Sequence, residues 1–341
     1  MLWTTRTPLR VSLFGGGTDY PEYFSRHPGA VVGFAIDRYI HISALSLTAF
    51  QDYNYRVAYS KLELVDKIEQ IEHPVVRAVL ADYEITDRLD ISIMSDLPAS
   101  GSGLGSSSTF TVGMVSLVLS MLARKVTKSD IARKATYVER ELLGENVGVQ
   151  DQLHAAFGGI NRFDFEGNKT RITPVQLSGS VLGELSRHMV LVHTGIARRA
   201  TSTVAAQLEA TKAKTIDHEL GHLYSLVAEC VEILERPGGR FLDELGAILS
   251  ESWKVKRSLS GGVSNGDIDQ LFEAIVGAGA YGAKLCGAGG GGFFFALVPP
   301  ERQAQLRERV APRAVIPISI DVDGTTLVYS ADRARTSALS H

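Results

Sequence analysis

A run of small residues, Gly101-Ser-Gly-Leu-Gly-Ser-Ser-Ser108, carries the clearest chemistry in this sequence. Residues 89–94 before it alternate in period two, as a half-buried strand does. From Phe110 onward an apolar helical pattern follows, so the run lies at a helix N-terminus. Unpaired N–H groups and the positive end of the helix dipole meet there, and glycines let the backbone approach an anion closely. The run therefore predicts a phosphate site, although a flexible turn with a serine cap is the simpler alternative.

Two further glycine runs frame the rest of the chain. The first, at 15–17, follows a predicted strand over residues 6–14 and leads into Thr18 and Asp19, whose carboxylate can accept hydrogen bonds from hydroxyl groups. An ordinary glycine-rich turn explains this stretch equally well. The last run, at 287–292, precedes a strand pattern instead of opening a helix, so it fails the structural context of a dinucleotide-binding loop. Together, the runs at 101–105 and 287–292 could line one anionic ligand at a domain interface.

Asp151 is an acidic residue just inside a helical pattern that ends at Gly158. Such a carboxylate can pair with the helix dipole, which is worth about 0.3–1 kcal/mol, or act as a catalytic base. The local pattern by itself favours the structural interpretation. His154 lies on the same helical face, and a core or solvated histidine is the simplest account of it.

The segment His218-Glu-Leu-Gly-His222 matches the zinc-protease pattern His-Glu-x-x-His. A zinc site needs a third ligand, and the metzincin extension that would supply it is missing here. Glu244 or Glu251 could serve, but a zinc hydrolase would leave the glycine runs unexplained. The pattern is better explained as the surface of a helix.

Composition limits the class of protein. With 341 residues, 45% apolar and 21% charged, the chain is typical of a globular protein of two domains. A net charge of -3 argues against nucleic-acid binding. Cys230 and Cys286 do not make a disulfide framework, the first residues lack a signal-peptide pattern, and the most apolar helix is too short for a bilayer. We expect a cytoplasmic protein without membrane or nucleic-acid partners.

The periodicity predicts helices alternating with a few antiparallel strands, which is an α+β architecture. Strands are expected at 6–14, 30–48, 55–59, 89–94, 160–165, 171–176, 189–194, 293–298, 314–320 and 325–329. Helices are expected at 74–83, from 110, and at 129–143, 199–213, 216–235, 241–257, 267–280 and 300–310. We place the domain boundary near residues 178–180, which gives an N-terminal domain of residues 1–180 and a C-terminal domain of residues 181–341.

The three glycine-centred stretches together resemble the signatures of the GHMP small-molecule kinases. They are Pro8-x-Arg-Val-x-x-x-Gly-Gly-Gly-Thr-Asp-Tyr20, Gly103-Leu-Gly-Ser-Ser107 and Lys284-Leu-x-Gly-Ala-Gly-Gly-Gly-Gly292. Within this family the first stretch and Gly148-Val-Gln-Asp-Gln152 are most similar to the bacterial D-glycero-D-manno-heptose 7-phosphate kinases. The resemblance implies a ribosomal-S5-like N-terminal domain, a ferredoxin-like C-terminal domain, and ATP with Mg²⁺ in the cleft between them.

The resemblance also implies a role for each matching position. Asp151 would be the catalytic aspartate with Arg10 beside it, and Ser107 and Glu139 would bind the metal, although Glu141 is an alternative to Glu139. The ATP phosphates would lie on Pro98, Gly101, Ser102, Gly103, Leu104, Gly105, Ser106, Ser107 and Ser108. The acceptor would contact Gly16, Gly17, Thr18, Asp19, Tyr20, Gly287, Ala288, Gly289, Gly290 and Gly291. Arg198, with Arg199, or the pair Lys256 and Arg257, would hold a phosphate of the substrate.

The expected activity is ATP-dependent phosphorylation of the anomeric C1 hydroxyl of a heptose 7-phosphate, for nucleotide-heptose and surface polysaccharide synthesis. Gly16 and Gly17 replace the Glu-His pair of galactokinase-like sequences, which argues against galactose. The loop between Pro98 and Gly103 is one residue longer than the family pattern, so the roles of its serines stay open. Fucose or mannose kinases, a zinc hydrolase and a silent binding relative are the alternatives, and a homo-oligomer is possible.

Overall fold

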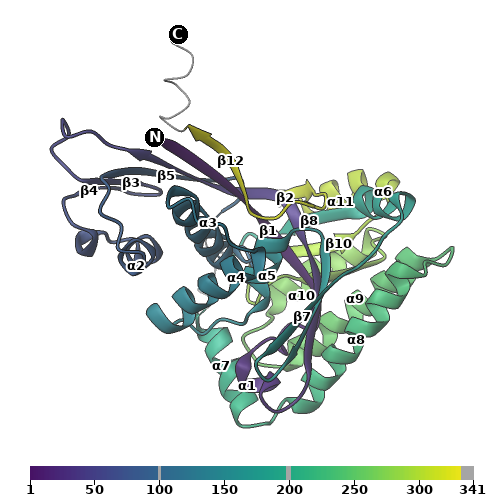
Figure 1. The fold of residues 1–341 in the computed structure, drawn as a ribbon. Helices are drawn as coiled ribbons and strands as arrows, with labels where there is room; N and C mark the ends of the chain where they lie inside the picture. The colour runs from purple at the N-terminus through teal and green to yellow at the C-terminus, as the bar shows by residue number, and fades with distance from the viewer. Residues whose placement is uncertain (99–100, 197–200, 332–341) are drawn as a thin grey trace.

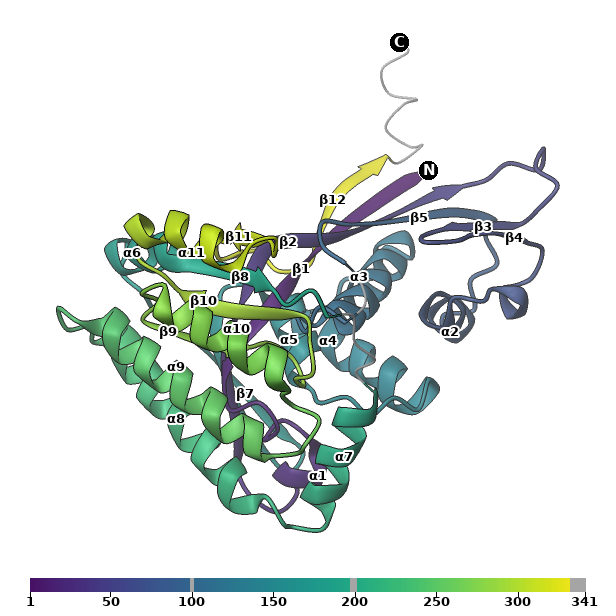
Figure 2. The same ribbon diagram turned by 180° about the vertical axis from the view of Figure 1, so that it is seen from behind.

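The chain folds around two sheets with helices packed on and between them (Figures 1 and 2). The computed structural model describes residues 1–98, 101–196 and 201–331. The strands are β1 (Leu2–Phe14), β2 (Gly29–Ser46), β3 (Tyr55–Ala58), β4 (Leu62–Val65), β5 (Leu89–Ser95), β6 (Ile160–Glu166), β7 (Lys169–Pro174), β8 (Met189–His193), β9 (Gly282–Leu285), β10 (Phe293–Leu297), β11 (Val315–Pro317) and β12 (Thr326–Ala331).

The α-helices are α1 (Pro21–Phe24), α2 (Pro74–Asp82), α3 (Ser106–Met121), α4 (Lys128–Tyr137), α5 (Gln150–Phe157), α6 (Gly179–His188), α7 (Thr201–Lys212), α8 (Asp217–Glu235), α9 (Phe241–Ser258), α10 (Gly266–Gly277) and α11 (Gln303–Val310). Short 3₁₀ turns cover Ile68–Gln70 and Pro300–Arg302, and a π-helical turn covers Val138–Leu142. None of these described helices is long and apolar enough to cross a membrane.

The first sheet has eight strands, with β12-β1-β2-β5-β3-β4 as its path and β6 and β7 joined to the other half of β2. The strand β2 is long enough to serve two partners: Gly29–Phe34 pairs with β6, and Ile40–Ser46 pairs with β5. All pairings are antiparallel except that of β3 with β5. The last described strand, β12, returns to pair with β1 at the N-terminal end of the chain (Figure 1).

The helix α3 runs through the core beside the first sheet. Thirteen of its sixteen residues are buried, because the helix has apolar or small side chains on every side. It packs against β1 and β2 and is flanked by α2, α4 and α5 (Figure 1). Its N-terminus follows directly from the glycine-serine run, as the sequence predicts.

The second sheet has four antiparallel strands in the order β11-β8-β10-β9. The helices α8 and α9 pack against each other, and α9 also packs on β9 (Figure 2). The strand β10 carries Phe293, Phe294 and Phe295, which are all buried. Their alternation sends Phe294 into the core of this sheet and the other two toward the main core. The α+β architecture is therefore confirmed.

Five stretches differ from the expected elements. Residues 179–188, for which no element was expected, form α6, because Ser178 caps the backbone N–H of Val181 and the helix buries Val181 and Leu185. The strand β9 precedes the last glycine run, and the strands expected at 314–320 shorten to β11. The helix expected at 129–143 ends in the π-helical turn, and β4 had no predicted counterpart. A domain division near residue 180 stays a proposal. The strand β12 comes after that boundary in the sequence, but it pairs with β1 of the first sheet.

Candidate active site

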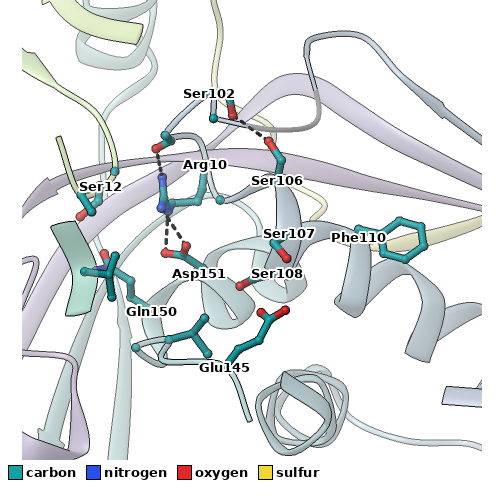
Figure 3. Close-up of a pocket in the computed structure, with 18 of the residues that line it drawn as sticks. Arg10, Ser12, Ser102, Ser106, Ser107, Ser108, Phe110, Glu145, Gln150 and Asp151 are labelled. Atoms are coloured by element: carbon teal, nitrogen blue, oxygen red, sulfur yellow. Dashed lines mark hydrogen bonds and ion pairs between the residues drawn. The ribbon is translucent and has the colours of Figure 1, made fainter. Parts of the chain in front are cut away.

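One cavity of about 1160 Å³ lies where the two halves of the chain meet. Its walls come from β1, the glycine-serine run, the N-terminal ends of α3 and α5, the helices α7 and α9, and the start of the last glycine run. Residues far apart in the sequence thus line one cavity (Figure 3). A cavity of this size between domains is typical of a small-molecule site.

The glycine-serine run has a conformation that only glycines adopt easily. Gly101, Gly103 and Gly105 have φ angles of 73°, 76° and 74°, and Gly105 is the N-cap residue of α3. The Ser102 and Ser106 hydroxyl oxygens lie 2.8 Å apart, which ties the loop to the first turn of the helix. The first N–H groups of α3 have no carbonyl partners within the helix, and their residues Ser106, Ser107 and Ser108 line the cavity, as an anion site requires.

The glycine-serine run at 101–108 and the last glycine run at 287–292 lie in direct contact. A Cβ atom on Gly103 would lie 2.6 Å from the carbonyl oxygen of Cys286, and one on Gly292 would lie 2.4 Å from that of Ser102. The backbone N–H of Phe293 donates to the carbonyl oxygen of Ser102 at 3.1 Å. The absence of side chains is what allows this approach, so the expected convergence of the two runs is present.

Arg10 and Asp151 form a bidentate ion pair at the centre of the cavity (Figure 3). The Nε and Nη2 atoms of Arg10 donate to the two carboxylate oxygens at 2.7 and 2.8 Å, and Nη1 donates to the carbonyl oxygen of Gly103 at 2.8 Å. A register shift in β1 between Pro8 and Arg10 turns this side chain toward the run, and the backbone N–H of Arg10 donates to the carbonyl oxygen of Leu104. The arginine is buried, whereas the Asp151 side chain is 26% exposed toward the cavity.

Asp19 is a second carboxylate on the cavity wall. Its side chain accepts hydrogen bonds from the backbone N–H groups of Gly17 at 3.0 Å and Gln150 at 3.4 Å. Burial, together with the nearby charge of Asp151, raises the pKa of Asp19 to about 6. Gly148 leaves room for it, because a Cβ atom there would lie 2.0 Å from an Asp19 carboxylate oxygen.

The neighbours of Asp19 divide between cavity and core. Gly16, Gly17 and Tyr20 line the cavity. Thr18 does not: it is fully buried, and its hydroxyl oxygen lies 2.8 Å from the carbonyl oxygens of both Gly15 and Ala30, to either of which it can donate. Its position is that of a residue that holds the loop in shape, so a direct contact of Thr18 with a substrate stays only a prediction.

Of the expected metal ligands, Ser107 belongs to the first turn of α3, and Glu139 contacts that turn through Ser108 without lining the cavity. Ser107 is exposed to the cavity, whereas Glu139 is fully buried in the π-helical turn and accepts hydrogen bonds from Ser108 at 3.0 Å and Gln152 at 2.6 Å. Burial raises the pKa of Glu139 to about 8, so a nearby cation would favour its ionised form. Glu141 is exposed and, within the described structure, makes no hydrogen bond to Ser108 or Gln152, whereas Glu139 bonds to both. Of the two glutamates, Glu139 is the one that faces inward.

Glu145 is a carboxylate that sequence reasoning missed. It lines the cavity on the same side as Ser107 and Ser108 (Figure 3), and burial raises its pKa. The hydroxyl of Ser107 and the carboxylates of Glu139 and Glu145 are the oxygen donors that Mg²⁺ prefers, so these residues fit that ion. Within the described residues no group of three or more His, Cys, Asp or Glu side chains could hold a metal by itself. Oxygen ligands from a bound nucleotide would complete such a site.

An aromatic end of the cavity was also missed. The rings of Tyr59 and His73 lie 4.9 Å apart, and those of His73 and Phe110 lie 4.7 Å apart. These three side chains and Lys61 line the cavity beyond the first turn of α3. No local motif marks them, because they come from three separate segments that only the fold brings together.

The remaining predicted residues fall into three groups. Gly101, Ser102, Gly103, Gly105, Ser106, Ser107, Ser108, Gly287 and Ala288 line the cavity. Pro98, Leu104, Gly289, Gly290 and Gly291 are next to these but do not belong to its lining. Arg198 and Arg199 lie outside the described residues.

The histidine pair of the zinc pattern has no metal-like surroundings. His218 is exposed, and Nε2 of His222 lies 2.7 Å from a carboxylate oxygen of Glu251 on the surface. No third ligand joins them among the described side chains. The zinc-hydrolase alternative therefore finds no support in this geometry.

Comparison with known proteins gives a consistent result. The model of the GHMP kinases N terminal domain matches residues 71–159, and that of the GHMP kinases C terminal domain matches residues 231–315. The D-glycero-alpha-D-manno-heptose 7-phosphate kinase of Campylobacter jejuni is 31% identical over 313 residues, which cover 89% of this chain and 91% of that protein. The galactokinase of Pyrococcus furiosus is 27% identical and covers 90% of this chain and 94% of its own length.

Among solved structures, a D-glycero-D-manno-heptose 1-phosphate kinase from Bacteroides thetaiotaomicron has a TM-score of 0.79 at 23% identity. The match covers 97% of this chain and all of that one. A mevalonate kinase from Methanococcus jannaschii gives 0.71 at 20% identity over 93% of this chain and 98% of its own. At these identities the two structures show a shared fold.

Proposed function

We propose, since the chain belongs to the GHMP kinase family and is an ATP-dependent sugar kinase, that its acceptor is D-glycero-D-manno-heptose 7-phosphate and that the C1 hydroxyl is phosphorylated. The observation that carries this proposal is the Arg10–Asp151 pair, which faces a cavity shared with the glycine runs. The 31% identity to a heptose 7-phosphate kinase supports the choice of sugar.

Asp151 takes the proton of the attacking hydroxyl as its oxygen bonds to the γ-phosphorus of ATP. The bond from that phosphorus to the β,γ-bridging oxygen breaks, and ADP leaves. The transition state of phosphoryl transfer is loose, so positioning and neutralisation of charge account for most of the acceleration. Arg10 holds the Asp151 carboxylate by two hydrogen bonds and adds a fixed positive charge beside the reacting oxygens.

The N–H groups at the start of α3 and the glycine runs hold the phosphates of the nucleotide. Ser107, with Glu139 and Glu145, would hold Mg²⁺, which neutralises phosphate charge when it is bound. Asp19 accepts hydrogen bonds from hydroxyls of the sugar, in a pocket that Gly16 and Gly17 leave without side chains.

A screen of acceptors by coupled ADP release tests the proposal. We expect heptose 7-phosphate to exceed mannose, fucose and galactose by at least about 100-fold in kcat/KM, with a phosphorus NMR signal of an anomeric phosphate in the product. Rapid turnover of an unphosphorylated hexose, with heptose 7-phosphate unreactive, would overturn the choice of acceptor. In that event fucose or mannose becomes the substrate of a kinase with the same machinery.

A further inference from the structure

One wall of the cavity, formed by α9, has polar groups for which the phosphoryl-transfer steps have no use. Ser252 and Lys256 are one helical turn apart, so they share a face, and both line the cavity. Ser252 is fully buried, and its hydroxyl has no hydrogen-bond partner among the described residues. Because a buried hydroxyl without a partner is unfavourable, a ligand that reaches α9 is the expected partner.

Ser12, on another wall of the cavity, has the same property as Ser252. It lines the cavity from β1, and its hydroxyl is also buried without a partner in the described part of the chain (Figure 3). A Cβ atom on Gly16 would lie 3.6 Å from this oxygen and 3.7 Å from Nε2 of Gln150. The missing side chain at Gly16 therefore leaves space in front of two polar groups.

Two lysines give this end of the cavity a positive charge. Lys256 Nζ donates to the carbonyl oxygens of Leu285, at 3.2 Å, and Gly287, and Lys284 Nζ donates to those of Ser12, at 3.1 Å, and Leu13. The carbonyl oxygens orient the Lys284 ammonium group but do not cancel its charge. Burial and the charge of Arg10 lower the pKa of Lys284 to about 8, so an anion nearby would strengthen the preference for its charged form.

Arg257, the neighbour of Lys256, faces elsewhere. Its guanidinium donates to a carboxylate oxygen of Asp269 at 2.8 Å and lies over the ring of Trp253. Neither Arg257 nor Asp269 lines the cavity. Of the two basic residues expected to hold a substrate phosphate on this helix, only the lysine reaches the site.

We propose that Ser252 and Lys256 bind a phosphate group that the acceptor carries at the end remote from the hydroxyl under attack. Cations and hydroxyl donors are the groups that recognise a phosphate monoester. Lys284, on β9, adds a second positive charge near this phosphate, and Ser12 faces the sugar. This inference rests on the proposed function and deepens it, because it names the groups that distinguish a phosphorylated from an unphosphorylated acceptor.

Substitution of Ser252 by Ala is the sharpest test, because the hydroxyl contributes no hydrogen bond to the described fold. We expect Ser252→Ala to raise KM for heptose 7-phosphate about tenfold, with kcat and the KM of ATP within about twofold. The same heptose without its phosphate should bind Ser252→Ala and the unaltered enzyme with equal Kd in calorimetry. The thermal midpoint should be unchanged or higher, because an unpaired buried oxygen is removed.

Lys256→Met provides a second variant, with a larger expected rise in KM for the phosphorylated sugar and partial recovery in Lys256→Arg. Ser258→Ala and Lys254→Met are matched controls on exposed positions of the same helix and should behave like the unaltered enzyme. Equal loss of affinity for both sugars, or no loss for either in Ser252→Ala, would overturn the inference.

The outcomes also separate this inference from the proposed function. If the unaltered enzyme binds heptose 7-phosphate through Ser252 but does not phosphorylate it, the proposed reaction fails and the phosphate subsite stands. If it phosphorylates heptose 7-phosphate and Ser252→Ala keeps the same KM, the reaction stands and the subsite fails.

Discussion

At the scale of single residues, Asp19 depends on a neighbour that has no side chain. A methyl group on Gly148 would lie 2.0 Å from an Asp19 carboxylate oxygen and 2.8 Å from its Cγ atom. Gly148→Ala should therefore displace Asp19 and raise the KM of the acceptor at least about tenfold, with little change in the KM of ATP. Steady-state kinetics with both substrates varied measures the two constants. Gly183→Ala, at a glycine with open space around it, is the matched control, and equal effects of the two substitutions would contradict this role.

The raised pKa of Asp19 predicts a pH dependence. Its carboxylate is ionised only above about pH 6, because burial and the charge of Asp151 oppose ionisation. We expect kcat/KM for the acceptor to fall about tenfold per pH unit below that value, whereas an ordinary aspartate would titrate near 4. Asp19→Asn should lose this limb of the pH profile. A limb that persists in the variant would belong to the phosphate of the acceptor, which also titrates near pH 6, and would contradict the assignment.

The sequence predicted the central residues better than their surroundings. Arg10 and Asp151 matched family positions, and the structure brings them into hydrogen-bond contact. The local sequence around Asp151, taken by itself, favoured a structural role, because a carboxylate in the first turn of a helix is common. Glu145 and Ser252 had no motif, since their importance depends on which side chains lie opposite them in space.

At the scale of elements, the loop before α3 depends on close contact with the last glycine run. Gly103→Ala places a Cβ atom 2.6 Å from the carbonyl oxygen of Cys286 at a φ of 76°. We expect the Kd of ATP, measured by calorimetry, to rise at least about tenfold. Gly167→Ala is a matched control, because that glycine also has a positive φ, of 54°, but no neighbour within 4 Å. The control should lose only about 1–2 kcal/mol of stability, which is the cost of a left-handed backbone at a residue with a side chain. A similar loss of ATP affinity in the control would contradict the role of the contact with Cys286.

The helix α5 carries a buried neutral imidazole that makes the fold sensitive to acid. His154 is fully buried, neither ring nitrogen has a partner in the described structure, and burial lowers its pKa from 6.5 to about 3. The unfolded chain binds a proton below pH 6.5 that the folded chain excludes, so stability is lost as the pH falls from there toward 3.

From about pH 7.5 to about pH 5.5, this residue should lower the free energy of unfolding by about 1.4 kcal/mol. Urea unfolding at the two pH values measures the difference. His154→Leu should remove that component while keeping the fold, because the ring makes no hydrogen bond there. An unchanged difference in the variant would show that other groups cause the loss.

Predicted and observed elements agree where periodicity is strong. The buried helix α3 and the strand β5 before it follow directly from an apolar run and a period-two pattern. The π-helical turn at Val138–Leu142 was not predicted, because the sequence there continues the helical pattern of α4 without a break. The strand β9 was hidden because it is short and merges into a glycine-rich stretch.

At the scale of the whole molecule, function depends on bringing the two ends of the sequence together. The strand β1 supplies Arg10, the middle of the chain supplies the N-terminus of α3 and Asp151, and the last third supplies Lys284, Gly287 and Ala288. Lys284 donates to carbonyl oxygens of β1, and so ties the second sheet to the first. The two glycine runs suggested a shared anion site independently of the resemblance, but the places of Arg10 and Asp151 in it followed only from the resemblance, because no local pattern encodes contacts over such separations.

The most direct test of the account is a comparison of Asp151→Asn with the unaltered enzyme in turnover and in ATP binding. Asparagine keeps the shape of the side chain but cannot take a proton, so kcat should fall at least about 1000-fold while the Kd of ATP stays within about threefold. Asp164→Asn, which alters an aspartate paired with Arg162 away from the cavity, should change neither. A kcat for Asp151→Asn within tenfold of the unaltered enzyme would contradict the central claim that Asp151 receives the proton of the acceptor.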